Sequence, residues 1–241
     1  MRIAVLGVGS VGGVLVGALA DTGAELLCIS RGETVTSLEV GLVIHTPEGA
    51  MEMVSSDRYE VIDSEKEPIP EFHRSSCDVA IIAGKASSTP VLASIAEELL
   101  APSGVAISIQ NGLGHAETLS NRVGRERVLG GSTTHSAWRD GDGSVHWSGR
   151  GSVHLGKLDG SEADGVSQEL LDCLNIAGLD PNWSPNVHRM IWRKLLINVA
   201  INPVCAIAGV RNGALVEVPE LWEQSLESMR EAEAVARAAG V

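Results

Sequence analysis

The sequence predicts an α/β protein, with a doubly wound, mainly parallel sheet followed by an all-helical C-terminal domain. Three observations carry this prediction. Short apolar runs alternate with helical stretches, glycines cluster directly after the first run, and the chain after residue 185 has a helical pattern. Fully apolar strands separated by helices are typical of a parallel sheet covered on both faces. We expect residues 1–184 to form the sheet domain and residues 185–241 the helical one.

The first elements form a βαβ unit. Residues 2–6 are a short apolar run, and residues 26–29 are a second. Between them, Val11, Val14 and Leu15 begin a helical spacing that Gly23 is placed to stop.

The later elements follow from the same patterns. We predict strands at 78–83 and 104–109, a helix at 91–100, and helices at 187–208 and 219–239. Within 128–156 we predict antiparallel strands at the sheet edge, at 144–147 and 152–155. A break at 180–185 is expected to be the hinge between the domains.

Six residues between the first strand and its helix carry a G-x-G-x-x-G pattern: Gly7, Val8, Gly9, Ser10, Val11 and Gly12. In this context the first glycine permits a tight turn, the second admits a pyrophosphate to the backbone, and the third packs the helix on the strand. We therefore predict a Rossmann-type dinucleotide site. Glycines that serve helix packing alone remain the alternative.

The second strand ends at Ser30 and Arg31. An NAD enzyme usually has a carboxylate there, which would repel a 2′-phosphate, whereas Arg31 can pair with that phosphate and Ser30 can add a hydrogen bond. The pair favours NADP (NADPH) over NAD, and a plain surface arginine is the alternative.

Three polar residues interrupt the apolar helix predicted at 187–208. Lys194, Asn198 and Asn202 are spaced i, i+4, i+8 and so share one face. We expect this helix to be buried on most sides, with the stripe facing a ligand or cleft. Pro203 is expected to kink it. A lysine that reaches solvent and asparagines that bond across a domain interface remain alternatives.

Two further segments lie at the carboxyl ends of predicted strands, where ligands of doubly wound sheets bind. Lys85 follows the strand that ends near Ala83, and Gln110-Asn111-Gly112 follows the next strand. Each is a weak signal alone, because Asn-Gly is above all a turn signal.

Composition limits the partners. The formal charge of −13 argues against nucleic acid and against anionic membranes, so we expect a soluble protein that binds small molecules. Four scattered cysteines indicate neither a disulfide framework nor a zinc site, and they suit a reducing cytoplasm. The uncharged run from Ile3 to Ala20 resembles a signal peptide, but its glycines favour the βαβ interpretation.

Taken together, these residues resemble the ketopantoate reductase (2-dehydropantoate 2-reductase) family. The resemblance runs through the whole chain and rests on the following segments: the glycine motif, Ser30-Arg31, Asp78 to Lys85, Gln110 to Gly114 with Glu117, Thr133-Thr134-His135, and Trp192-Arg193-Lys194 with Asn198 and Asn202-Pro203.

The resemblance implies NADPH-dependent reduction of ketopantoate to pantoate, a step of pantothenate and coenzyme A biosynthesis. It implies that Lys194 is the general acid and that Asn111 lies between nicotinamide and substrate. Asn198, Asn202 and Glu231 would contact the substrate, and Lys85 the cofactor.

The family usually continues beyond Val241 with helices that supply further substrate contacts, so we expect a truncated helical domain. Two alternatives to the leading function follow: a related NADP-dependent reductase of another 2-oxoacid, and a non-catalytic NADP-binding fragment. Apolar surface left by the short domain could support a homodimer.

Overall fold

The computed structural model describes all 241 residues. They divide into two compact units, one of residues 1–110 with 114–187, the other of residues 111–113 with 188–241. The first unit contains two sheets and five α-helices, and the second is built around three helices.

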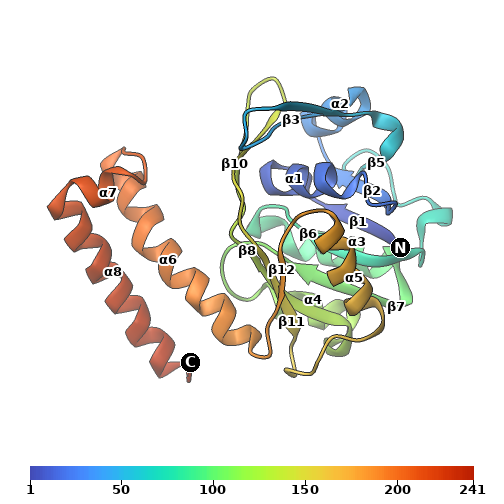
Figure 1. The fold of residues 1–241 in the computed structure, drawn as a ribbon. Coiled ribbons are helices and arrows are strands. Elements are labelled where there is room, and N and C mark those ends of the chain that lie inside the picture. Colours follow the sequence, from blue (N-terminus) through green and yellow to red (C-terminus); the bar gives the residue numbers. More distant parts are fainter. The chain divides into compact units, whose positions relative to one another are not determined.

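The main sheet has eight strands in the order β12-β11-β8-β7-β6-β1-β2-β5 (Figure 1). They are β1 (Arg2–Leu6), β2 (Glu25–Ser30), β5 (Glu60–Asp63), β6 (Cys77–Ile82), β7 (Leu100–Ser108), β8 (Val128–Thr133), β11 (Val153–Lys157) and β12 (Pro181–Trp183). Only the β8/β11 pair is antiparallel. The predicted α/β class with a mainly parallel sheet is confirmed.

The helices of the first unit cover both faces of this sheet. They are α1 (Ser10–Leu19), α2 (Glu33–Val40), α3 (Thr89–Leu99), α4 (His115–Val123) and α5 (Gly165–Ile176). In β1, Ile3 and Val5 join the core that contains α1 and α5, whereas Ala4 and Leu6 join the core that contains α3 and α4. All four are fully buried, which is why β1 is apolar at every position after Arg2.

A second, four-stranded sheet lies outside α1, in the order β4-β3-β10-β9. Its strands are β3 (Leu42–His45), β4 (Met51–Val54), β9 (Ser136–Arg139) and β10 (Val145–Gly149). α1 approaches this sheet closely, since a Cβ on Gly13 would lie 2.7 Å from Val145 Cγ2. The prediction that residues 144–147 form a strand at the edge of the main sheet is wrong, because β10 pairs with β3, a partner about a hundred positions away.

The segment predicted as a hinge is also partly regular. Residues 181–183 form β12, which pairs in parallel with β11, so this part of the predicted break belongs to the main sheet. The backbone N–H of Ser184, the residue after β12, donates to Leu155 O at 2.8 Å and so extends the pairing with β11.

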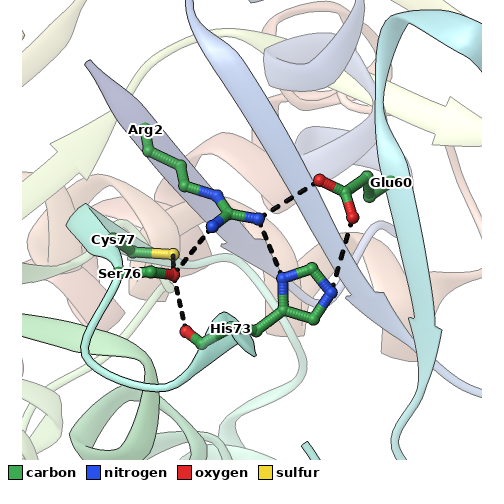
Figure 2. Close-up of polar contacts among 5 residues, drawn as sticks. All are labelled: Arg2, Glu60, His73, Ser76 and Cys77. Atoms are coloured by element: carbon green, nitrogen blue, oxygen red, sulfur yellow. Dashed lines mark hydrogen bonds and ion pairs between the residues drawn. The ribbon is translucent and has the colours of Figure 1, made fainter. Parts of the chain in front are cut away.

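At the amino end of the parallel strands, a polar cluster of Arg2, Glu60, His73 and Ser76 closes the sheet (Figure 2). Arg2 Nη1 donates to Ser76 Oγ at 2.9 Å, and Arg2 Nη2 lies 2.8 Å from His73 Nδ1 and 3.2 Å from Glu60 Oε1. Arginine can only donate, so Nδ1 of His73 is the acceptor and its proton is on Nε2. That nitrogen faces Glu60 Oε2 at 3.4 Å.

The second unit contains α6 (Val187–Ala208), α7 (Ala214–Glu217) and α8 (Pro219–Ala238), with Val187 itself in the first unit. Val204, Cys205 and Leu215 form its small apolar core. The helix α6 continues through Pro203. Burial on most sides of α6, which we expected, is wrong: Ile197 is 48% and Ile207 89% exposed, because α7 and α8 cover only part of its length.

α6 is long and apolar enough to cross a membrane by length and composition alone. Core helices of soluble proteins pass the same test, so this single helix is weak evidence for a membrane span.

Candidate functional site

The four segments predicted to hold a cofactor follow strands β1, β2, β6 and β7. These strands are mutually parallel and adjacent in the order β7-β6-β1-β2, so their carboxyl ends meet at one edge of the main sheet. The chain leaves β1 toward β2 on one side and later returns to β6 on the other side. Ligands of doubly wound sheets bind at such a switch point.

The glycine turn is built by close backbone contacts. Gly7 has a φ of +92°, and its N–H donates to Ile29 O at 2.8 Å. A Cβ on Gly7 would overlap the backbone of Gly84, which lies two residues after the end of β6. A Cβ on Gly12 would overlap the carbonyl oxygen of Gly7. The first and third glycines are therefore required by the fold of the turn itself.

Gly9 differs, because a Cβ there would meet nothing within 4 Å. It directly precedes α1, whose first residue is Ser10, and no side chain caps this helix start. The N-terminal N–H groups and the helix dipole thus lie beside open space, an arrangement that suits an anionic pyrophosphate. Residues Val8 to Val11 frame the same turn, with Val8 fully buried.

Ser30 and Arg31 lie where predicted, at the end of β2. Ser30 is 8% exposed, and its carbonyl accepts a hydrogen bond from Ser64 N–H at 2.9 Å. The side chain of Arg31 is 63% exposed and pairs with Glu65 at 3.1 Å. An exposed ion pair of this kind is weak, so the guanidinium can exchange Glu65 for a phosphate.

Lys85 is exposed at the start of the short turn after Gly84. The residue that fixes this turn is Gln110, to which the sequence assigned no role of its own. Its Nε2 donates to Gly84 O at 2.8 Å, and its Oε1 accepts from Ser108 Oγ at 3.0 Å. Thr89 Oγ1 also lies 3.0 Å from Oε1. An amide residue directly after the strand predicted at 104–109 was the only sequence signal for this role.

The second unit contains the polar stripe of α6. Lys194 is half-buried without an ion pair, and burial lowers the pKa of its ammonium group. Asn198 Nδ2 donates to Asn111 Oδ1 at 3.2 Å, so these two predicted residues are in contact. Asn202 and Glu231 are exposed on α6 and α8, and no hydrogen bond joins them to Lys194.

Comparison with known proteins decides the family. The family described as "Ketopantoate reductase PanE/ApbA" matches residues 3–160, and its C-terminal part matches residues 186–241. The chain belongs to the ketopantoate reductase family. The match includes both the glycine turn and the α6 stripe, and it makes the chain an oxidoreductase of this family.

Two 2-dehydropantoate 2-reductases and one solved structure are similar to most or all of this chain. The 2-dehydropantoate 2-reductase of Archaeoglobus fulgidus is 32% identical over 223 residues, which are 92% of this chain and 69% of the relative. That of Halobacterium salinarum is 32% identical over 250 residues, 100% of this chain and 77% of the relative. A structure of D-mandelate dehydrogenase with NADH has a TM-score of 0.84 at 26% identity, covering 100% of this chain and 74% of that one.

Proposed function

We propose that this ketopantoate reductase family member reduces 2-dehydropantoate (ketopantoate) to pantoate with NADPH, a step of pantothenate and coenzyme A biosynthesis. The observation that carries the proposal is the glycine turn at the switch point of the sheet, with open space at Gly9 and a cationic residue after β2. Family membership connects this cofactor site to a 2-oxoacid substrate. Residues 1–184 would bind the cofactor and residues 185–241 the substrate.

The residues present fit NADPH. The backbone from Gly7 to Gly12 would hold the pyrophosphate, and Ser30 with Arg31 would hold the 2′-phosphate. Lys85 would add a positive charge from the neighbouring turn, which Gln110 fixes through Gly84. When bound, the nicotinamide supplies a hydride to the ketone carbon of the substrate.

Lys194 would supply the proton. Its ammonium group stabilises the negative charge that grows on the ketone oxygen and then protonates that oxygen. A lysine is a better acid near neutral pH when its pKa falls, and burial lowers the pKa of Lys194. Asn111 and Asn198, which already contact each other, would orient the substrate with Asn202 and Glu231.

The test is an assay of NADPH oxidation at 340 nm with ketopantoate and a panel of other 2-oxoacids. Lys194→Ala should lower kcat by about a hundredfold or more, since general acid catalysis is typically worth that much. A smaller loss contradicts the role of Lys194. Arg31→Ala should weaken NADPH much more than NADH, and equal weakening would remove the argument from the 2′-phosphate.

A second candidate is reduction of a different 2-oxoacid. The D-mandelate dehydrogenase likeness favours it, because that protein shares the fold of the entire chain. Turnover of another 2-oxoacid faster than ketopantoate would support this candidate. NADPH binding without any turnover would instead favour a non-catalytic NADP-binding fragment.

We also propose a cytoplasmic location, in keeping with four free cysteines, and a homodimer. Sedimentation of the purified chain would test the homodimer.

A further inference from the structure

An arginine from the small sheet reaches the glycine turn. Arg139 is the last residue of β9, and its Nη1 donates to the carbonyl oxygen of Val8 at 2.7 Å. The two residues are 131 positions apart in the chain. Val8 is fully buried, and Arg139 is half-buried, so the contact lies beneath the turn, away from bulk water.

This hydrogen bond fixes the orientation of one peptide group. The peptide between Val8 and Gly9 is planar and trans, so its C=O and N–H point in opposite directions. With the carbonyl held on Arg139, the N–H of Gly9 points away from the guanidinium. Gly9 is the glycine of the turn beside open space, where a Cβ would meet nothing within 4 Å.

The electrostatic setting of Arg139 is unusual for a structural arginine. No carboxylate pairs with it, and its Nη2 atom is buried without a hydrogen-bond partner. Burial lowers the pKa of the Arg139 guanidinium, and Tyr59, itself buried, is the titratable neighbour that opposes this shift. A buried donor without a partner is costly, so packing alone does not explain a guanidinium at this position.

We propose that Arg139 is a positioning residue for the dinucleotide: it holds the Val8–Gly9 peptide in the orientation that receives the pyrophosphate before the cofactor arrives. A turn ordered in advance lowers the cost of binding, and the adjacent positive charge favours a diphosphate. The inference rests on the proposed function, because it requires this turn to bind NADPH.

Two variants of similar side-chain length test it. Arg139→Met removes both donor and charge, whereas Arg139→Lys keeps one donor and the charge. Arg139→Met should raise the Kd and the KM for NADPH about tenfold or more, the usual effect of losing a hydrogen bond to a charged group. Arg139→Lys should recover most of this loss. With saturating NADPH, kcat should stay within about twofold of wild type, because Arg139 does not act on the reacting atoms.

Arg150→Met is the matched control. Arg150 pairs with Glu48 and lies 4.4 Å above the ring of Trp147, without a contact to the glycine turn. Arg150→Met removes one positive charge from the residue that follows β10, in the same four-stranded sheet as Arg139. NADPH affinity of this variant should remain within about twofold of wild type.

The outcomes separate the two proposals. If wild type does not bind NADPH, both the proposed function and this inference fail. If wild type binds and Arg139→Met binds equally well, only the positioning role fails. Failure of Arg139→Lys to recover affinity also overturns it. Should Arg139→Met not fold, the smaller Arg139→Ala, which also removes the donor and the charge, takes its place, and NADPH affinity equal to wild type in Arg139→Ala overturns the role.

Discussion

The polar groups at the amino end of the main sheet are paired with one another, whereas backbone N–H groups at its carboxyl end lie beside open space. At the amino end, Arg2, Glu60, His73 and Ser76 satisfy one another, and His73 is only 3% exposed (Figure 2). At the carboxyl end, the turn at Gly9 leaves backbone N–H groups beside open space. A closed polar network stabilises a fold, whereas an open set of donors is a binding site. The amino end is therefore expected to contribute stability, and the open donors at the carboxyl end support the cofactor site proposed above.

The largest expected effect comes from Gly7→Ala at the carboxyl end. The new Cβ would overlap Gly84, and the φ of +92° is unfavourable for alanine, so we expect a loss of stability of about 3 kcal/mol or more. Urea denaturation measures it. A loss below about 1 kcal/mol would show that the turn relaxes without its contact to Gly84.

Arg2→Met should have the next largest effect, at the amino end. It leaves His73 Nδ1 and Glu60 Oε1 without their donor, and we expect a loss of stability of about 2 kcal/mol with unchanged NADPH affinity. The control is Arg122→Met, which breaks an exposed ion pair with Glu97 and should cost about 0.5 kcal/mol or less. Weaker NADPH binding by Arg2→Met would mean that the two ends are coupled.

Gly9→Ala sharpens the contrast within the turn itself. Its Cβ meets no protein atom, so stability should change by about 1 kcal/mol at most, yet the methyl group occupies the space assigned to the pyrophosphate. We expect NADPH affinity to fall about tenfold, measured by fluorescence titration. Wild-type affinity would exclude a close approach of the cofactor at Gly9.

The smallest effect is the pH dependence of stability from two buried histidines. Burial lowers the pKa of His73 and of His135 from 6.5. For His73, Glu60 opposes this shift, and Arg2 adds to it. His135 Nδ1 accepts from Gly151 N–H, and its Nε2 faces Leu179 O at 3.1 Å, so both rings are neutral.

In the unfolded chain both imidazoles bind a proton as the pH falls through 6.5, whereas in the folded chain they bind it only at lower pH. Stability is therefore complete above that pH and falls as the pH drops below it. Denaturation between about pH 8 and about pH 5 measures the slope and avoids the carboxylates, whose lowered pKa values act only at more acidic pH. His73→Asn, which retains an acceptor for Arg2, should flatten the slope. Stability that rises on acidification would contradict both assignments.

Much of the first unit was predictable because its signals are local. The apolar runs of β1 and β2 and the spacing of Gly7, Gly9 and Gly12 identify a βαβ unit within the first thirty residues. The residues assigned to the cofactor lie at the ends of adjacent parallel strands, as the order of elements requires. Their roles in binding and catalysis remain predictions.

What the sequence by itself determined was the α/β class, the glycine turn and the family, since each can be recognised from short segments whose patterns are local. Only the tertiary structure decided which distant segments meet. The small sheet joins β3 to β10, Gly84 packs on Gly7, and Arg139 reaches the carbonyl of Val8 across 131 residues. Short strands and single side chains carry too little periodic pattern to reveal such partners, because those contacts exist only once the whole core has closed.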